Sequence, residues 1–304
     1  MKTKKAHLAD MTLLLVAMCW GATFPMFKEC INAGMSGVLV NAFKFTIAAV
    51  AIGIIFCREI PKITKKEFLI GAKVGLLLVA ADLCQGIGQE ITSPANSAVI
   101  TSFYVVLIPV FWWLLDKRGQ GKRLLLASIL CVLGVVILNY SQDSAVSLNF
   151  GDALVFCCAV LTACQIITVG IAAGNISPKK IAVVQMSVCA AFSWAASLVG
   201  GQFNLSAIEF SPKIVFDLLY LGLIGTCFGF GVQLFAQKHT SPTNAGICMS
   251  LEGLFGALFS VFFKMQALSA QLILGTALTV AGVIIAELSG SGSAHEKETS
   301  RNIP

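Results

Sequence analysis

Three charged residues with the potential for chemistry, Lys44, Asp82 and Glu252, lie inside long apolar runs. A charged side chain near the centre of a bilayer costs about 3 kcal/mol on insertion scales, so such residues usually contact substrates, ions or one another. Lys44 lies near the middle of the apolar run 36–56. It can contact a substrate or counter-ion, or form a structural ion pair with Asp82 or Glu252, and the sequence leaves this choice open.

Neutral polar and aromatic residues recur at helical spacing in the same kind of run. Gln85 follows Asp82 by three residues, so the two share one face of a helix. The further candidates are Trp20, Thr23, Thr101, Tyr104, Thr162, Gln165 and Gln185. The last five can simply form hydrogen bonds between helices. Trp20 and Thr23 lie where the first apolar run meets Pro25, a predicted bend, and can either pack there or line the pathway. Together they predict a polar pathway through apolar surroundings.

The composition indicates that a lipid bilayer surrounds most of this chain. Hydrophobic residues make up 57% of the 304 residues and charged residues 12%, whereas a soluble domain carries about 25% charged residues. Too few polar residues remain to cover a surface that faces water. This excludes a soluble enzyme, a disordered protein and a nucleic-acid binder.

Ten apolar runs are long enough to cross a membrane, because a spanning helix needs about 20 apolar residues. They cover residues 9–27, 36–56, 69–87, 95–115, 124–140, 152–173, 181–200, 214–235, 244–263 and 268–288. The predicted fold is therefore all-α and integral to the membrane, with ten transmembrane helices. The fifth and tenth runs are apolar around their whole circumference, which predicts a peripheral position.

Basic residues are distributed unequally between the two sets of loops. Both termini and the loops 57–68, 116–123, 174–180 and 236–243 hold 16 Lys and Arg residues, and the alternate loops hold three. Because cytoplasmic loops are enriched in Lys and Arg, the sequence predicts a multi-pass protein of the cell membrane with both termini in the cytoplasm. Residues 1–8 form a short N-terminus, and the polar tail 289–304 is predicted to be disordered.

The second half of the chain resembles the first. GVVIL at 134–138 recurs as GVIIA at 282–286, Lys44 aligns with Gln185, and the segment from Thr101 aligns with the segment from Ser250. This predicts a first repeat at 9–140, an extracytoplasmic linker at 141–151 and a second repeat at 152–288. Five spans is an odd number, so the second repeat enters the membrane from the opposite side. Such inverted repeats are typical of transporters.

Several motifs resemble those of EamA-type transporters of the drug/metabolite transporter superfamily. They are WGATFP at 20–25, FKFTIAAV at 43–50, ITSFYVVLIPVF at 100–111, GDALVFCCAVLTACQI at 151–166 and QKHTSPTNAGICMSLEGLFGALFS at 237–260. The resemblance extends over roughly residues 8–288. It implies ten helices in a five-plus-five inverted repeat, and export or exchange of small metabolites. The chain departs from the family at three places. The family usually has Arg where Lys44 stands, often has Glu-Pro where this chain has Glu252-Gly253, and often has Gly-Glu where this chain has Met265-Gln266.

These features favour a secondary transporter that moves a small metabolite by alternating access, in export or exchange. The solute would be amino acid-like or another small polar or amphipathic molecule. The P-loop pattern GxxxxGK[ST] does not occur in the chain, which argues against ATP hydrolysis. A coupling ion such as the proton, or a counter-transported metabolite, would then supply the energy.

Two other classes of protein are weaker alternatives. One is a non-transporting membrane receptor or scaffold, and the other, the least favoured, is an intramembrane enzyme. His7, His239 and His295 all lie in loops or tails, and nucleophilic or metal chemistry needs a constellation of side chains within the spans. We therefore expect no catalytic residue, cofactor, metal site or nucleic-acid partner, and either a monomer or a homodimer.

Overall fold

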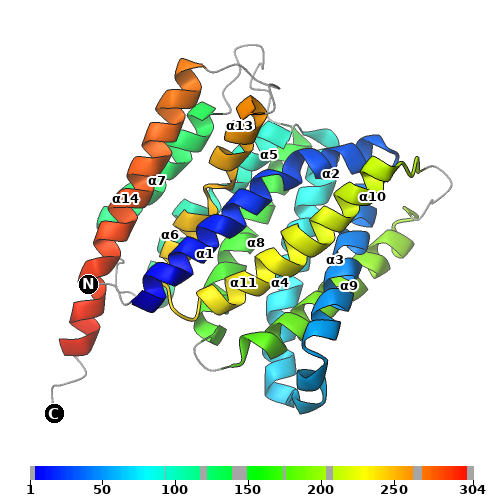
Figure 1. The fold of residues 1–304 in the computed structure, drawn as a ribbon, viewed down its shortest axis with the longest axis horizontal. Coiled ribbons are helices and arrows are strands. Elements are labelled where there is room, and N and C mark those ends of the chain that lie inside the picture. The colour runs from blue at the N-terminus through cyan, green and yellow to red at the C-terminus, as the bar shows by residue number, and fades with distance from the viewer. Residues whose placement is uncertain are drawn as a thin grey trace.

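The computed structural model describes residues 4–92, 94–116, 122–138, 149–173, 176–202, 208–262 and 269–299. In these ranges the chain forms helices joined by short turns and contains no strand (Figure 1). Six helical stretches are long and apolar enough to cross a membrane: Lys4–Asn32, Gly37–Ile55, Ser97–Leu115, Phe150–Ala172, Pro178–Val199 and Pro212–Ala236. The protein is therefore an all-helical, multi-pass membrane protein.

The helices of the first half correspond to the first five apolar runs. They are α1 (Lys4–Gly21), α2 (Thr23–Asn32), α3 (Gly37–Ile55), the short 3-10 helix η1 (Cys57–Lys62), α4 (Lys65–Ile91), α5 (Pro94–Thr101), α6 (Tyr104–Asp116) and α7 (Lys122–Leu138). Two of the five runs are divided: α1 and α2 share the first, and α5 and α6 share the fourth.

The helices of the second half follow the remaining runs. They are α8 (Phe150–Ala173), α9 (Pro178–Val199), α10 (Pro212–Leu219), the π-helix η3 (Tyr220–Phe228), α11 (Gly229–Ala236), α12 (Pro242–Met249), α13 (Glu252–Phe262) and α14 (Ala270–Thr299). The helix α14 extends into the polar tail as far as Thr299.

Several helices begin at a residue that caps them. The Ser36 hydroxyl accepts from the backbone N–H of Leu39 at the start of α3. Thr64 and Glu67 form a capping box at the start of α4, in which each side chain accepts from the other residue's backbone N–H. A capped terminus satisfies N–H groups that have no partner within the helix. These caps fix where each helix leaves the loop and therefore which side chains face inward.

The first apolar run breaks earlier than its sequence suggests. The expected bend was at Pro25, whereas α1 ends at Gly21 and α2 begins at Thr23. A proline ring in a helix clashes with the carbonyl group four residues before it, and that residue is Gly21. The break therefore lies where the clash would occur, and Pro25 remains inside the first turn of α2.

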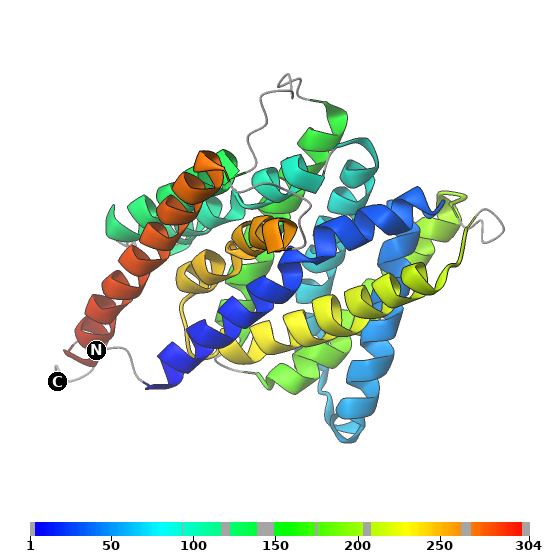
Figure 2. The same cartoon turned by 45° about the horizontal axis from the view of Figure 1, so that its top comes forward.

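Two helix pairs form opposite flanks of the molecule. The helices α7 and α14 pack side by side at one flank, and α3 and α9 do so at the other (Figures 1 and 2). Gly134 of α7 permits a close approach, because a Cβ atom there would lie 2.7 Å from the carbonyl oxygen of Gly275. Many outer side chains of this pair are exposed apolar groups, such as Leu133 and Ile273. Their position agrees with the periphery predicted for the fifth and tenth runs.

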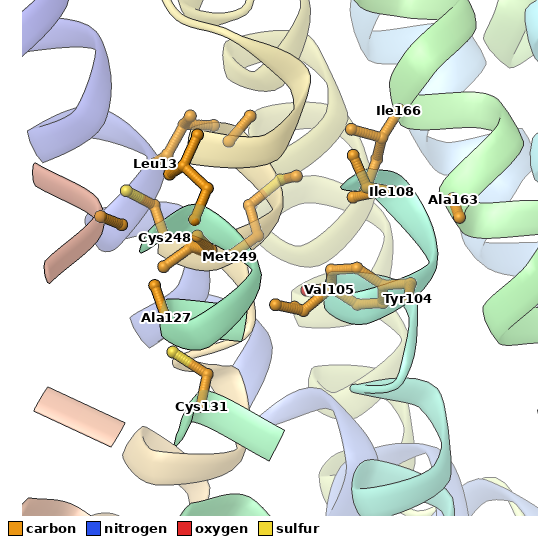
Figure 3. Close-up of a cluster of buried hydrophobic side chains, with 14 of the residues drawn as sticks. Leu13, Tyr104, Val105, Ile108, Ala127, Cys131, Ala163, Ile166, Cys248 and Met249 are labelled. Carbon is orange, nitrogen blue, oxygen red and sulfur yellow. The ribbon is translucent and has the colours of Figure 1, made fainter. Parts of the chain in front are cut away.

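A buried apolar cluster joins the two halves between these flanks. Side chains of α1, α6, α7, α8 and α12 meet in it, as Figure 3 shows for Leu13, Ile108 and Met249. All three are fully buried. Tyr104 belongs to the same cluster, so the core holds the first residue of α6 in a fixed position.

Candidate functional site: a polar cavity between the helices

A cavity lies among α1, α2, α3, α4, α8, η3 and α13. Its volume is about 90 Å³, enough for several water molecules, since each needs roughly 10–15 Å³ of such space. Its polar lining consists of Thr23, Lys44, Asp82, Gln85, Gln89, Thr101, Cys158, Thr162, Gln165, Thr226, Gln233 and Glu252, and its aromatic lining of Trp20, Phe24, Phe27, Tyr104 and Phe230. Residues far apart in the sequence therefore meet around one polar space.

Ten of the eleven side chains proposed from the sequence line this cavity, and Gln185 does not. Gln185 is fully buried where α9 crosses α4, and a Cβ atom on Gly75 would lie 3.0 Å from its carbonyl oxygen. Neither polar atom of its side chain has a hydrogen-bond partner among the described residues. Gln185 aligns with Lys44 in the repeat but belongs to a helix contact.

Lys44 and Asp82 form an ion pair across α3 and α4. The Nζ atom of Lys44 lies 3.2 Å from Oδ2 of Asp82, and each side chain is only 10% exposed. The backbone beside the pair is tied as well, because Asn41 Nδ2 donates to the carbonyl oxygen of Asp82 over 2.7 Å. The Lys44 ammonium also lies 5.5 Å from the ring centroid of Phe27, within cation–π range. The buried positive and negative charges therefore offset each other.

Glu252 is the first residue of α13, directly after the break that separates α12 from α13. It is 6% exposed, and within the part of the chain that the structure describes its carboxylate forms no ion pair and no side-chain hydrogen bond. Close contact with α1 fixes this segment, since a Cβ atom on Gly21 would lie 2.9 Å from the Glu252 carbonyl oxygen. Tyr104 occupies the same place in α6, and its buried hydroxyl also lacks a hydrogen-bond partner.

Two hydrogen bonds join the π-helix η3 to α1, the first part of the broken first run. Trp20 Nε1 donates to the carbonyl oxygen of Gly225 over 2.7 Å, and the Tyr220 hydroxyl donates to that of Cys19 over 3.0 Å. A Cβ atom on Gly229 would overlap the indole ring of Trp20. π-Helical turns are rare and occur frequently at functional sites. Here the turn brings carbonyl groups and small residues next to the cavity.

Glutamine side chains connect neighbouring helices around the cavity. Gln85 Nε2 donates to Thr101 Oγ1 over 3.1 Å, and Gln89 Nε2 donates to the Ser97 hydroxyl over 3.2 Å. Gln233 Nε2 donates to Gln165 Oε1 over 3.2 Å. One amide atom of Gln89, Gln165 and Gln233 remains without a hydrogen-bond partner among the described groups. Unsatisfied buried polar groups are costly, so these side chains are suited to bind a polar solute.

Sequence reasoning missed several lining residues. Phe24 and Phe27 follow Trp20 at helical spacing, so this aromatic stripe was a usable signal. Gln233 is a polar residue inside an apolar run and was a second signal. Gln89 follows Asp82 by seven residues on the same helix face, and the structure buries it beside the cavity. The described residues contain no group of three or more His, Cys, Asp or Glu side chains arranged to hold a metal ion.

A polar cavity enclosed by membrane-spanning helices is typical of α-helical membrane transport proteins. Two segments, residues 7–140 and 149–288, match the sequence profile of the EamA-like transporter family. The chain belongs to this family, and the two matches divide it into two similar halves.

Two relatives have similar lengths and extend over most of the chain. A protein of Archaeoglobus fulgidus named "Uncharacterized transporter" is 29% identical over 284 residues, which cover 92% of this chain and 86% of the relative. The "Uncharacterized transporter YetK" of Bacillus subtilis is 24% identical, with 81% and 77% covered. A solved crystal structure has the same fold, with a TM-score of 0.75 at 16% identity, covering 95% of this chain and 99% of that one.

Proposed function

We propose that this protein is a secondary transporter that moves a small metabolite across the cell membrane by alternating access, in export or exchange. The observation that carries the proposal is the cavity, where Lys44, Asp82 and Glu252 meet although they come from α3, α4 and α13. Buried charges within membrane spans are costly and usually belong to a transport pathway. The family and the names of its relatives also support a transporter.

Ten spans in two inverted repeats account for the helix contacts. If each half supplies five spans, exchanging the two halves places α4 at the position of η3 and α11, and places α8 at the position of α1. The contact of α4 with α8 then corresponds to the contact of α1 with η3 and α11. The contact of α4 with α9 corresponds to that of α3 with η3. When the halves are exchanged, α3 takes the position of α9 and α7 takes that of α14, so each of these two flanking pairs maps onto itself. Such pairing is expected for two repeats related by a pseudo-two-fold axis.

The broken helices support alternating access. The fourth run breaks between α5 and α6, and the ninth breaks between α12 and α13, so the breaks occupy equivalent places in the two repeats. Discontinuous helices at the repeat interface are a recurring feature of transporter binding sites. We propose that the two repeats rock about this interface, with a proton or a counter-transported metabolite as the coupling species.

A transport assay tests the proposal. Metabolites would first be compared in the medium of cells with and without the protein, and each solute that differs would be tested for counterflow in proteoliposomes. Protein-free liposomes and liposomes with the Gly53→Ala variant are the controls, because a Cβ atom at Gly53 meets no other group within 4 Å. We expect accumulation of labelled solute with the wild type and with Gly53→Ala, and none without protein.

The same assay separates the alternatives. A receptor or scaffold would bind a solute without counterflow, and an intramembrane enzyme would release a chemically altered product. Either result, obtained with a solute that binds the purified protein, would overturn the transporter proposal.

A further inference from the structure

We infer that the cavity binds a small solute through a positively charged amino group, with Glu252 as the ion-pair partner and the aromatic lining as the wall for an apolar body. This inference rests on the proposed function and adds the substrate class to it.

The charges around the cavity determine its preferred ligand. Lys44, the cation of the lining, lies 3.2 Å from Asp82 and is offset by it. Glu252 is the remaining carboxylate of the lining. Opposite charges within about 4 Å largely cancel, whereas an unpaired charge in a low-dielectric site attracts a counter-charge strongly. With Glu252 ionised, the lining carries a net negative charge.

The surroundings of Glu252 fit an ammonium group in particular. The side chain is only 6% exposed, and among the described residues it forms no ion pair and no side-chain hydrogen bond. Gln89 and Gln233 also line the cavity, and the side-chain oxygen of each is buried without a hydrogen-bond donor among the described residues. An ammonium has three donors and no acceptor, so it can use a carboxylate together with such amide oxygens.

Aromatic rings supply the second part of the site. Trp20 and Phe230 lie with their ring centroids 5.0 Å apart at an interplanar angle of 49°. Phe24, Phe27 and Tyr104 complete the aromatic lining. The faces of aromatic rings attract cations, and their carbon surface favours an apolar body. The cavity volume of about 90 Å³ corresponds to on the order of six to nine water molecules, which limits the solute to a small amine.

A solute that carries only a carboxylate fits this lining poorly. It would need a free cation, but Lys44 is engaged by Asp82, and separating the pair would leave Asp82 unpaired in a buried site. Removing one partner from a buried ion pair is strongly unfavourable. The site therefore discriminates between amines and carboxylates of the same size and shape.

A matched set of probes tests this inference. Binding of n-propylamine, 1-propanol and propionate, which are small enough for a cavity of about 90 Å³, would be measured by isothermal titration calorimetry on the full-length purified protein in detergent. We expect the amine to bind at least tenfold more tightly than the alcohol and the carboxylate. Glu252→Gln, which removes the charge and keeps the shape, should weaken amine binding at least tenfold. Glu59→Gln makes the same chemical change in η1, away from the cavity, and should leave amine binding unchanged.

Three outcomes would overturn the inference. They are equal affinity for the amine and the alcohol, tighter binding of the carboxylate, and equal amine binding by wild type and Glu252→Gln, as expected if Glu252 only carries a proton. If Glu252→Gln does not fold, the comparison of amine and alcohol on the wild type decides alone. If a solute shows counterflow but the amine does not bind, the substrate class is wrong and the proposed function stands. If the amine binds but no solute shows counterflow, the proposed function is wrong and the amine site stands.

Discussion

Lys44 Nζ lies 3.2 Å from Asp82 Oδ2, and this contact joins α3 to α4 at the wall of the cavity. The sequence offered two carboxylates as partners for Lys44, and the structure pairs it with Asp82. The pair has two separable consequences, one for stability and one for transport.

Removing only one member of the pair should destabilise the protein. Lys44→Met leaves the buried Asp82 carboxylate unpaired, and such a change costs about 3–5 kcal/mol of unfolding free energy. The double variant Lys44→Met/Asp82→Asn should recover most of this loss, because neither buried charge remains. Chemical denaturation in detergent measures both values. Equal stability of the single and double variants would contradict the cost assigned to the unpaired Asp82 carboxylate.

The same double variant tests the role of Lys44 in transport. We expect it to fold and to lose counterflow activity, because a lysine held in the lining of the pathway contributes to the working site. Normal counterflow by a stable double variant would show that Lys44 and Asp82 only join the two helices.

The orientation in the membrane can be tested independently of any substrate. Reporter fusions after Ser141 should read outside and fusions after Lys180 should read inside, since basic loops remain in the cytoplasm. The opposite readings would reverse the topology. Identical readings for the two sites would contradict the crossing of the membrane by residues 152–173, the run that lies between them.

Contact between α7 and α14 should depend on small residues. In Gly134→Ala the new Cβ atom would lie 2.7 Å from the carbonyl oxygen of Gly275 and 2.8 Å from the backbone nitrogen of Thr279. Overpacking against backbone costs about 1–3 kcal/mol, so the melting temperature should fall. Gly53→Ala, made in open space, is the matched control and should not lower it. Similar melting temperatures for the two variants would contradict the close approach.

Acid should weaken the link between α4 and α9. Glu67 accepts from the backbone N–H of Thr64 over 2.8 Å and from Lys180 Nζ over 2.9 Å. The Thr64 N–H first, and then Lys180, lower the pKa of Glu67 from 4.5 to about 2. The lowered pKa adds stability that is fully present above pH 4.5 and is lost as the pH falls to about 2.

Thermal unfolding of wild type and Glu67→Gln in an acid-stable detergent measures this effect. The wild type should be the more stable protein at neutral pH, and the difference should shrink between pH 4.5 and about 2. If the stability difference between wild type and Glu67→Gln stays constant from pH 4.5 to about 2, the ionisation of Glu67 is not its cause.

Helix positions followed directly from the sequence, because the bilayer imposes a simple rule. A spanning helix must be long and apolar, and a charge within it is costly, so runs and loops can be read from composition. The lining residues followed for a related reason, since a polar side chain in an apolar run needs a polar surrounding. This argument identified Lys44, Asp82 and Glu252 before their positions in space were known.

The sequence could not determine which polar residues face one another. Three features depend on how helices distant in sequence cross. They are the pairing of Lys44 with Asp82, the place of Glu252 in the cavity lining and the exclusion of Gln185 from that lining. Those crossings are set by close packing at small residues such as Gly21 and Gly75. Helical periodicity gives the face of a side chain on its own helix, whereas its partner depends on how the helices pack against each other, which tertiary structure alone decides.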